Sequence, residues 1–161
     1  MSSIVLSLDA MSMARAVTIA QQANPHVWGF KVRDLIYHYG VEIVYELKQF
    51  GNVIADARLN GDWRELTEDL RIFRNAGADI ITVTSPAGAG DPGDDLACFG
   101  FEPNEPYAYS MLRDVIINRK PFDVFLSRDD TPLVCYGRSI LAAENLAEEL
   151  QKLNEQSLGQ K

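Results

Sequence analysis

The sequence of 161 residues lacks several features that mark specialised classes of protein. It holds only two cysteines, Cys98 and Cys135, which lie too far apart for a metal-binding motif, so we expect reduced thiols. It has no apolar run of about 18 residues and no basic, apolar leader at its start. These absences predict a cytoplasmic protein that neither spans nor binds a membrane.

Positive charge is also scarce. The 15 lysines and arginines are outnumbered by 23 acidic residues, which gives a formal net charge of −8. Nucleic acids and anionic membranes need a basic surface, so neither is an expected partner, whereas a small anionic ligand needs only a few local cations. His26 and His38 are separate, and nothing fixes the geometry of Asp91, Asp94 and Asp95, so we predict no metal site and no cofactor.

What the first half of the chain does contain is a regular alternation of strand and helix patterns. Short apolar runs predict buried strands, and the segments between them repeat apolar residues at helical spacing. The expected strands are 4–8, 27–32, 52–55 and 80–83, and the expected helices are 11–23, 34–39, 41–49 and 62–76. Repeated units of strand and helix are typical of a parallel α/β sheet, for which a barrel is the natural closure.

The second half of the chain is less regular. Segment 85–106 is rich in glycine and proline, which predicts a long loop with one short strand over 97–101. Its glycine-rich stretch 88–93 lacks the Gly-Lys-Ser/Thr of a phosphate-binding loop. We expect this stretch to be a flexible loop or a lid over a ligand pocket. The remaining expected elements are helix 107–118, strand 122–126, turn 129–132, strand 133–136, an amphipathic helix 139–154 and a frayed end at 155–161.

The expected architecture is one α/β domain over 1–161, a shortened TIM-barrel-like fold with mainly parallel strands. The patterns supply about six or seven strands, whereas a complete eight-stranded barrel usually needs about 200 residues or more. Unpaired strand edges are a liability in a monomer. We therefore expect a homodimer.

The candidate site is built around the stretch 56–62, Asp-Ala-Arg-Leu-Asn-Gly-Asp, which follows an apolar strand. Asp9, Lys31 and Asp56 each close a strand pattern, so three strands bring charge to the carboxyl end of the sheet, where ligands bind in α/β folds. The alternative is that Asp62 caps the next helix and that the other charges are solvated.

Five segments in this order resemble the orotidine 5′-monophosphate decarboxylase family. They are SLD at 7–9, GFKV at 29–32, IADARLNGD at 54–62, GADIITVTSPAG at 77–88 and YGRSILAAENLAEEL at 136–150. The similarity covers 4–88 and 133–153, and the middle, 85–132, is divergent and shorter than in the family. The resemblance implies a TIM barrel, a cofactor-independent lyase of pyrimidine biosynthesis, and a homodimer.

The resemblance also implies site residues. The family's Asp-x-Lys-x-x-Asp motif, together with its second-strand lysine, gives a catalytic set of Lys31, Asp56, Arg58 and Asp62. The substrate-binding set is Asp9, Lys31, Thr84, Gly137 and Arg138, in which the Gly-Arg pair is expected to hold the ligand phosphate. In the family the last motif aspartate reaches into the neighbouring subunit's pocket.

Two positions depart from the motif. Arg58 stands where the family's lysine protonates the substrate ring, and an arginine, with a pKa above about 12, does not readily release its proton. Gly61 occupies the place of the last aspartate, and Asp62 follows one residue later. Three hypotheses stay open: a lyase acting on a nucleoside or sugar monophosphate, an inactive relative that binds a nucleoside monophosphate, and a structural or partner-binding protein.

Overall fold

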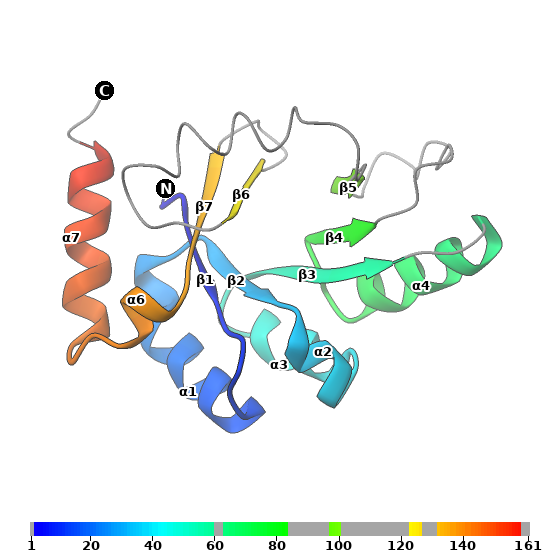
Figure 1. Cartoon of the computed structure of the whole chain (residues 1–161), viewed down its shortest axis with the longest axis horizontal. Coiled ribbons are helices and arrows are strands. Elements are labelled where there is room, and N and C mark those ends of the chain that lie inside the picture. Colours follow the sequence, from blue (N-terminus) through cyan, green and yellow to red (C-terminus); the bar gives the residue numbers. More distant parts are fainter. Residues whose placement is uncertain (1, 60–62, 84–96, 101–122, 127–131, 159–161) are drawn as a thin grey trace.

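The computed structural model describes residues 2–59, 63–83, 97–100, 123–126 and 132–158 (Figure 1). The strands are β1 (Ile4–Ser7), β2 (Gly29–Val32), β3 (Asn52–Leu59), β4 (Ile80–Val83), β5 (Ala97–Gly100), β6 (Asp123–Leu126) and β7 (Pro132–Tyr136). The helices are α1 (Met13–Ala23), the 3₁₀ turn η1 (Asn24–His26), α2 (Asp34–Tyr39), α3 (Glu42–Lys48), α4 (Trp63–Asn75), α6 (Arg138–Leu141) and α7 (Leu146–Leu158). The predicted helix 107–118 and the glycine-rich stretch 88–93 lie outside these residues.

All seven strands form one sheet in the order β5-β4-β3-β2-β1-β7-β6. Every neighbouring pair is parallel except β6 and β7, which are antiparallel. The sheet curls into a half-barrel, and the helices flank its outer side (Figure 1). The structure thus confirms the α/β, TIM-barrel-like, mainly parallel fold with six or seven strands.

The two faces of the sheet bury different side chains because successive residues of a strand point to opposite faces. On the outer face, residues such as Leu6, Phe30 and Ile81 belong to the large core shared with the helices. On the inner face, a second buried cluster joins β1, β3, β4 and β7, and it consists of Val5, Ile54, Ile80, Leu133 and Cys135. Both faces are therefore covered, as parallel sheets require.

Local signals explain most helix boundaries. The Ser12 side chain accepts a hydrogen bond from the Arg15 backbone N–H and caps α1. Helix α2 ends at Gly40, whose φ of +61° suits glycine. The Asn154 side chain donates to the His26 carbonyl at 2.7 Å and ties α7 to the turn after α1.

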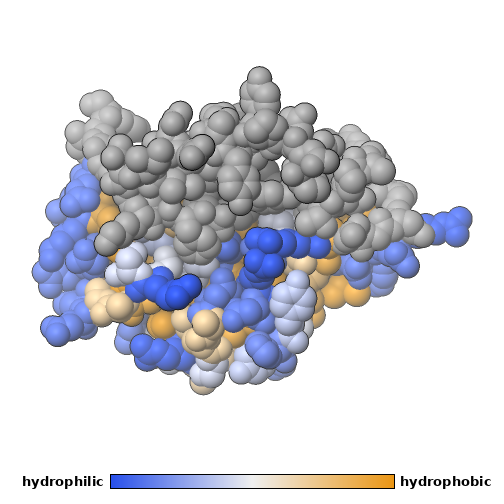
Figure 2. All heavy atoms as spheres, in the orientation of Figure 1, coloured by the Kyte–Doolittle hydropathy of each residue, from blue (hydrophilic) through white to orange (hydrophobic). Residues whose placement is uncertain are grey.

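On the face shown in Figure 2, the described surface is mainly hydrophilic, with only small separate hydrophobic areas.

Three predictions about where elements end are wrong. Strand β3 runs to Leu59 instead of ending at Ala55, because its pairing with β4 resumes between Leu59 and Val83 after an irregularity in register. The expected helix 139–154 is two helices, α6 and α7. Asn145 starts the second one: its side-chain oxygen accepts from the Glu148 N–H at 3.3 Å. The expected fraying at 155–161 is also wrong as far as Leu158, where α7 ends.

Candidate functional site

The inner face of the sheet carries a layer of buried polar side chains. Ser7, Lys31, Asp56 and Thr82 are the buried polar or charged residues of the described part of the chain. They come from β1, β2, β3 and β4, one from each strand. Ser7, Asp56 and Thr82 each follow a residue of the inner apolar cluster by two positions, so strand alternation places them on the same face and nearer the carboxyl ends.

Asp56 is the centre of this layer. Its Oδ2 lies 3.5 Å from the Lys31 Nζ, and both side chains are only 3% exposed. Its Oδ1 accepts a hydrogen bond from Thr82 Oγ1 at 2.8 Å and one from Arg58 Nε at 3.4 Å. A carboxylate this deeply buried is stable only with such partners. The network therefore holds the Asp56 carboxyl group between the Lys31 and Arg58 side chains.

Arg58 lies where β3 departs from regular geometry. Its φ of 48° is in the left-handed region, and the register with β4 shifts between Ala55 and Leu59. The Arg58 backbone N–H donates to Thr82 Oγ1 at 2.9 Å, so the hydroxyl that contacts Asp56 also supports the bulge. The guanidinium side chain is 41% exposed. Bulges and left-handed residues of this kind often re-aim a side chain at a functional site.

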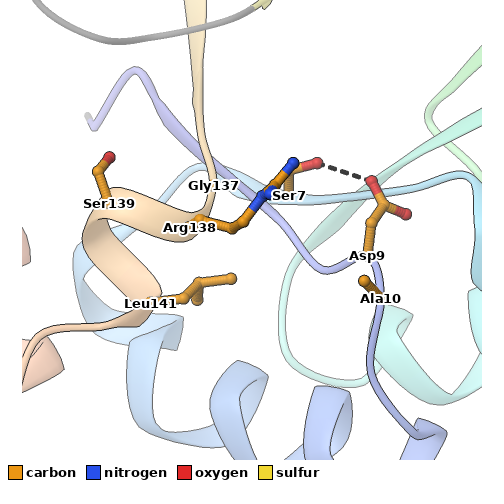
Figure 3. Close-up of a pocket in the computed structure, with 7 residues that line it drawn as sticks. All are labelled: Ser7, Asp9, Ala10, Gly137, Arg138, Ser139 and Leu141. Carbon is orange, nitrogen blue, oxygen red and sulfur yellow. Dashed lines mark hydrogen bonds between the residues drawn. The ribbon is translucent and has the colours of Figure 1, made fainter.

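A cavity of about 550 Å³ lies beside this layer, at the carboxyl ends of β1 and β7. Its lining residues are Ser7, Asp9, Ala10, Gly137, Arg138, Ser139 and Leu141. Figure 3 shows Arg138 extending from the start of α6 toward Ser7 and Asp9. Arg138 is exposed, and no acidic partner for it lies within the described ranges. It is thus a cation available to an anionic ligand.

Asp9 faces the same cavity and is held by several hydrogen bonds. Its Oδ2 accepts from Ser7 Oγ at 2.9 Å, and its Oδ1 accepts from the backbone N–H groups of Arg33 at 2.8 Å and Asp34 at 3.3 Å. Burial raises the pKa of Asp9, as does its contact with the Asp34 carboxyl, while the Arg33 N–H, the Ser7 hydroxyl and the Lys31 charge act in the opposite direction. The net pKa lies above the ordinary value for aspartate.

The structure brings most of the sequence-predicted residues into two adjoining groups. Lys31, Asp56 and Arg58 form the charged network, and Asp9 lines the cavity with Gly137 and Arg138. Asp62 and Thr84 lie outside the described residues. Asp56 does not close its strand as expected but lies within β3, whereas Lys31 lies near the end of β2, as expected. Both side chains are buried on the inner face of the sheet.

Sequence reasoning missed three residues. Ser7 and Thr82 interrupt apolar strands at positions of the inner face, and this period of two could have identified them. Asp34 comes directly after β2 and had the appearance of an ordinary helix start.

Two further classes of site find no support in the part of the chain that the structure describes. No group of three or more histidine, cysteine, aspartate or glutamate residues there could hold a metal ion. None of the helices described is both long enough and apolar enough to cross a membrane.

Comparison with known proteins gives a likeness of structure. No protein-family model matches the sequence, and no curated protein matches it. The orotidine 5′-phosphate decarboxylase of Pyrococcus horikoshii is similar with a TM-score of 0.68 at 19% identity, over 94% of this chain and 97% of that one. The enzyme of Methanocaldococcus jannaschii gives 0.64 at 20% identity, over 96% and 98%. Its complex with the inhibitor BMP gives 0.62 at 18% identity, over 96% and 98%. The chain therefore has the fold of the orotidine 5′-phosphate decarboxylases.

Proposed function

We propose that this protein binds a nucleoside monophosphate in the cavity at the carboxyl ends of β1 and β7. The observation that carries the proposal is the pairing of charges around one cavity of about 550 Å³: the Arg138 cation and the Asp9 carboxyl both line it. A volume in this range is typical of a small-molecule site. The ends of parallel strands are also where ligands bind in this class of fold.

The phosphate is expected at the Gly137–Arg138 end. A guanidinium presents several N–H donors in a plane and binds phosphate oxygens in pairs. The Ser139 side chain lines the same end of the cavity and offers a hydroxyl donor. Binding a phosphate to Arg138 breaks no ion pair with an acidic residue of the described part of the chain.

The sugar is expected at the Asp9 end. A carboxyl oxygen accepts hydrogen bonds from sugar hydroxyls, and Asp9 is already oriented by Ser7 and by two backbone N–H groups. The base, or whatever group the sugar carries, is then expected over the network of Lys31, Asp56 and Arg58. Asp62 and Thr84 stay in the proposed site on the family resemblance alone.

Carboxy-lyase activity is the second candidate, and the charged network of buried Lys31 and Asp56 with the half-exposed Arg58 favours it. In the mechanism implied by the resemblance, carboxylates crowd the substrate carboxylate, and a lysine then protonates the ring carbon. Arg58 occupies that lysine's place and holds its proton too tightly to deliver it. We therefore expect binding of the nucleotide without efficient turnover.

The binding proposal is tested by calorimetric titration with uridine monophosphate. The wild type should bind, and Arg138→Ala should weaken binding by about tenfold or more, because the phosphate loses a charge-assisted pair. Arg71→Ala is the matched control: it removes an arginine of α4 that does not line the cavity. Ribose 5-phosphate in parallel shows whether the base contributes. Absence of heat and of thermal stabilisation with both ligands would contradict the proposal and favour a structural or partner-binding role.

Turnover is tested separately by the ultraviolet absorbance of orotidine 5′-monophosphate. We expect no decarboxylation by the wild type and measurable decarboxylation by Arg58→Lys, which restores a group able to give up its proton. Efficient turnover by the wild type would show that Arg58 does not prevent the reaction. It would then support the lyase hypothesis.

The homodimer also stays a prediction, since it rests on the unpaired edges expected of a shortened barrel. Light scattering at micromolar concentration measures it directly. A monomeric mass would contradict the prediction, and it would leave the binding proposal intact because both walls of the cavity come from one chain.

A further inference from the structure

The loops that follow β1 and β2 hold each other through a reciprocal pair of aspartates. The Asp9 side chain accepts hydrogen bonds from the backbone N–H groups of Arg33, at 2.8 Å, and Asp34, at 3.3 Å. In return, the Asp34 side chain accepts one from the backbone N–H of Ala10 at 2.7 Å. Each loop thus supplies a carboxylate to the backbone of the other. Asp9 and Ala10 line the cavity, whereas Asp34 is absent from its lining.

The backbone of Ala10 is strained in this arrangement. Its φ of 58° lies in the left-handed region, which is sterically unfavourable for an alanine. Within the described ranges, Ala10 and Arg58 are the residues other than glycine with positive φ. Both lie beside the candidate site. Such strain persists only where neighbouring groups hold it, and at Ala10 the holding group is the Asp34 carboxylate.

The two carboxyl groups also contact each other. Asp34 Oδ1 is buried and has no hydrogen-bond partner among the described residues, unless a proton shared with Asp9 supplies one. The pKa of Asp9 is raised, chiefly by burial and then by its contact with Asp34. Burial also raises the pKa of Asp34, but the contact with Asp9 and the N–H groups of Ala10 and Leu35 outweigh it, so that this pKa is lowered. A proton held between the two carboxyl groups would therefore belong mainly to Asp9.

Groups on several elements act on the pair. Lys31 on β2 lowers the pKa of Asp9, His38 on α2 lowers the pKa of Asp34, and Arg138 at the start of α6 lines the same cavity as Asp9. The Lys31 and Arg138 cations favour a negative charge on the pair. A proton held between the two carboxyl groups would limit the pair to a single negative charge.

We propose that Asp34 is a positioning residue of the ligand site, which fixes the Asp9 carboxyl and the Ala10 backbone against the cavity and shares one proton with Asp9. The proposal rests on the proposed binding of a nucleoside monophosphate. It adds a form of regulation to that site: loss of the shared proton places a second negative charge next to an anionic ligand. Affinity is therefore expected to fall as the pH rises through the titration of Asp9.

Two substitutions separate the two roles. Asp34→Ala removes both the acceptor for the Ala10 N–H and the carboxylate that shares a proton with Asp9, so uridine monophosphate should bind about tenfold more weakly at every pH. Adding Ala10→Gly should recover part of that loss, because glycine adopts a positive φ without steric cost. Asp34→Asn can still accept from Ala10 and can donate to Asp9, so its affinity should stay near that of the wild type at low pH and should lack the decline at higher pH.

The measurement is the dissociation constant of uridine monophosphate between about pH 4 and pH 8, a range that covers carboxyl titration. Glu155→Gln on α7 is the matched control, since it neutralises an exposed carboxylate that does not line the cavity. The ligand phosphate itself titrates near pH 6, so each variant is compared with the wild type at the same pH. Wild-type affinity and pH dependence in both Asp34 variants would overturn the positioning role. No binding by the wild type would instead overturn the proposed function.

A second measurement uses the unmodified protein and does not depend on how the variants fold. Carboxyl NMR titration should find the pKa of Asp9 above and that of Asp34 below the ordinary aspartate value, with uridine monophosphate shifting both signals. Ordinary pKa values for both residues, or signals that the ligand leaves unmoved while calorimetry shows binding, would overturn the inference.

Discussion

The Lys31 ammonium lies 3.5 Å from the Asp56 carboxylate, and the two side chains are each only 3% exposed. The pair joins β2 to β3 on the inner face of the sheet, directly above an apolar cluster. Both residues belong to the proposed site, so the groups expected to meet the ligand also hold the sheet together. Changes here should therefore affect stability as well as binding.

Lys31→Met should destabilise the protein strongly, because it leaves Asp56 buried without its nearest ammonium. Breaking a buried ion pair from one side typically costs about 3–5 kcal/mol. Arg58 stays within 3.4 Å of Asp56, so we expect the lower end of that range, about 3 kcal/mol by urea denaturation. The double variant Lys31→Met/Asp56→Leu should recover part of the loss, since no buried charge remains. A double variant less stable than the single one would contradict this account.

Thr82→Val keeps the shape of the side chain and removes one hydroxyl. That hydroxyl donates to Asp56 and accepts from the Arg58 backbone, so we expect a loss of about 1–3 kcal/mol. Thr18→Val on α1 is the control, because its hydroxyl is exposed and bonds only the Ala14 carbonyl. It should stay within about 0.5 kcal/mol of the wild type. Equal losses for the two variants would show that the Thr82 hydroxyl has no special role.

Asp9→Asn should change how stability depends on pH. Because the pKa of Asp9 is raised in the folded state, its favourable contribution is complete below the unfolded value of 3.8 and is lost as the pH rises through the folded value. An asparagine does not titrate, so it removes this pH-dependent contribution to stability. The melting temperature of the variant should therefore rise relative to that of the wild type with increasing pH and then level off. Binding of uridine monophosphate should weaken. A difference in melting temperature that is constant across pH would contradict the prediction.

Gly29→Ala should destabilise the junction of β2 and β3 just below Lys31. A Cβ at position 29 would lie 2.1 Å from the Asn52 carbonyl oxygen, so one strand must move. Overpacking of this kind costs about 1–3 kcal/mol or more. Gly40→Ala is the comparison, since its Cβ meets nothing within 4 Å and only the positive φ opposes it. It should cost less, about 1 kcal/mol. The reverse order of stability in thermal melts would count against the close approach.

The order of strands and helices was predictable because their patterns are local. Apolar runs mark β1 to β4, and the helical stripes between them are strongly periodic, so their positions follow from neighbouring residues. The break between α6 and α7 escaped prediction because the apolar spacing continues across it, and only the capping bond of Asn145 separates the two helices. The extension of β3 escaped because a polar sequence with a left-handed Arg58 looks like a turn.

The candidate site was predictable only in part. Asp9, Lys31, Asp56 and Arg138 stand out as charged residues beside strand ends, and the structure places them around one region of the sheet. The contribution of Asp34 could not be read from the sequence, since it depends on two loops lying side by side in space. Burial also depends on the whole fold, so the strand patterns predict Lys31 and Asp56 at the carboxyl end of the sheet but do not show that both side chains are buried.

The pairing of β1 with β7 joins two segments that lie far apart in the sequence, for example Ile4 with Val134. Contacts between such distant segments are entropically costly to close and form slowly during folding. During synthesis, β1 to β4 and the Lys31–Asp56 pair can assemble first, whereas the cavity gains its second wall only when residues 132–141 have left the ribosome. A chain stopped before β7 would carry Asp9 without Arg138, so the phosphate binding proposed for this cavity is expected only after β7 and α6 have joined the sheet.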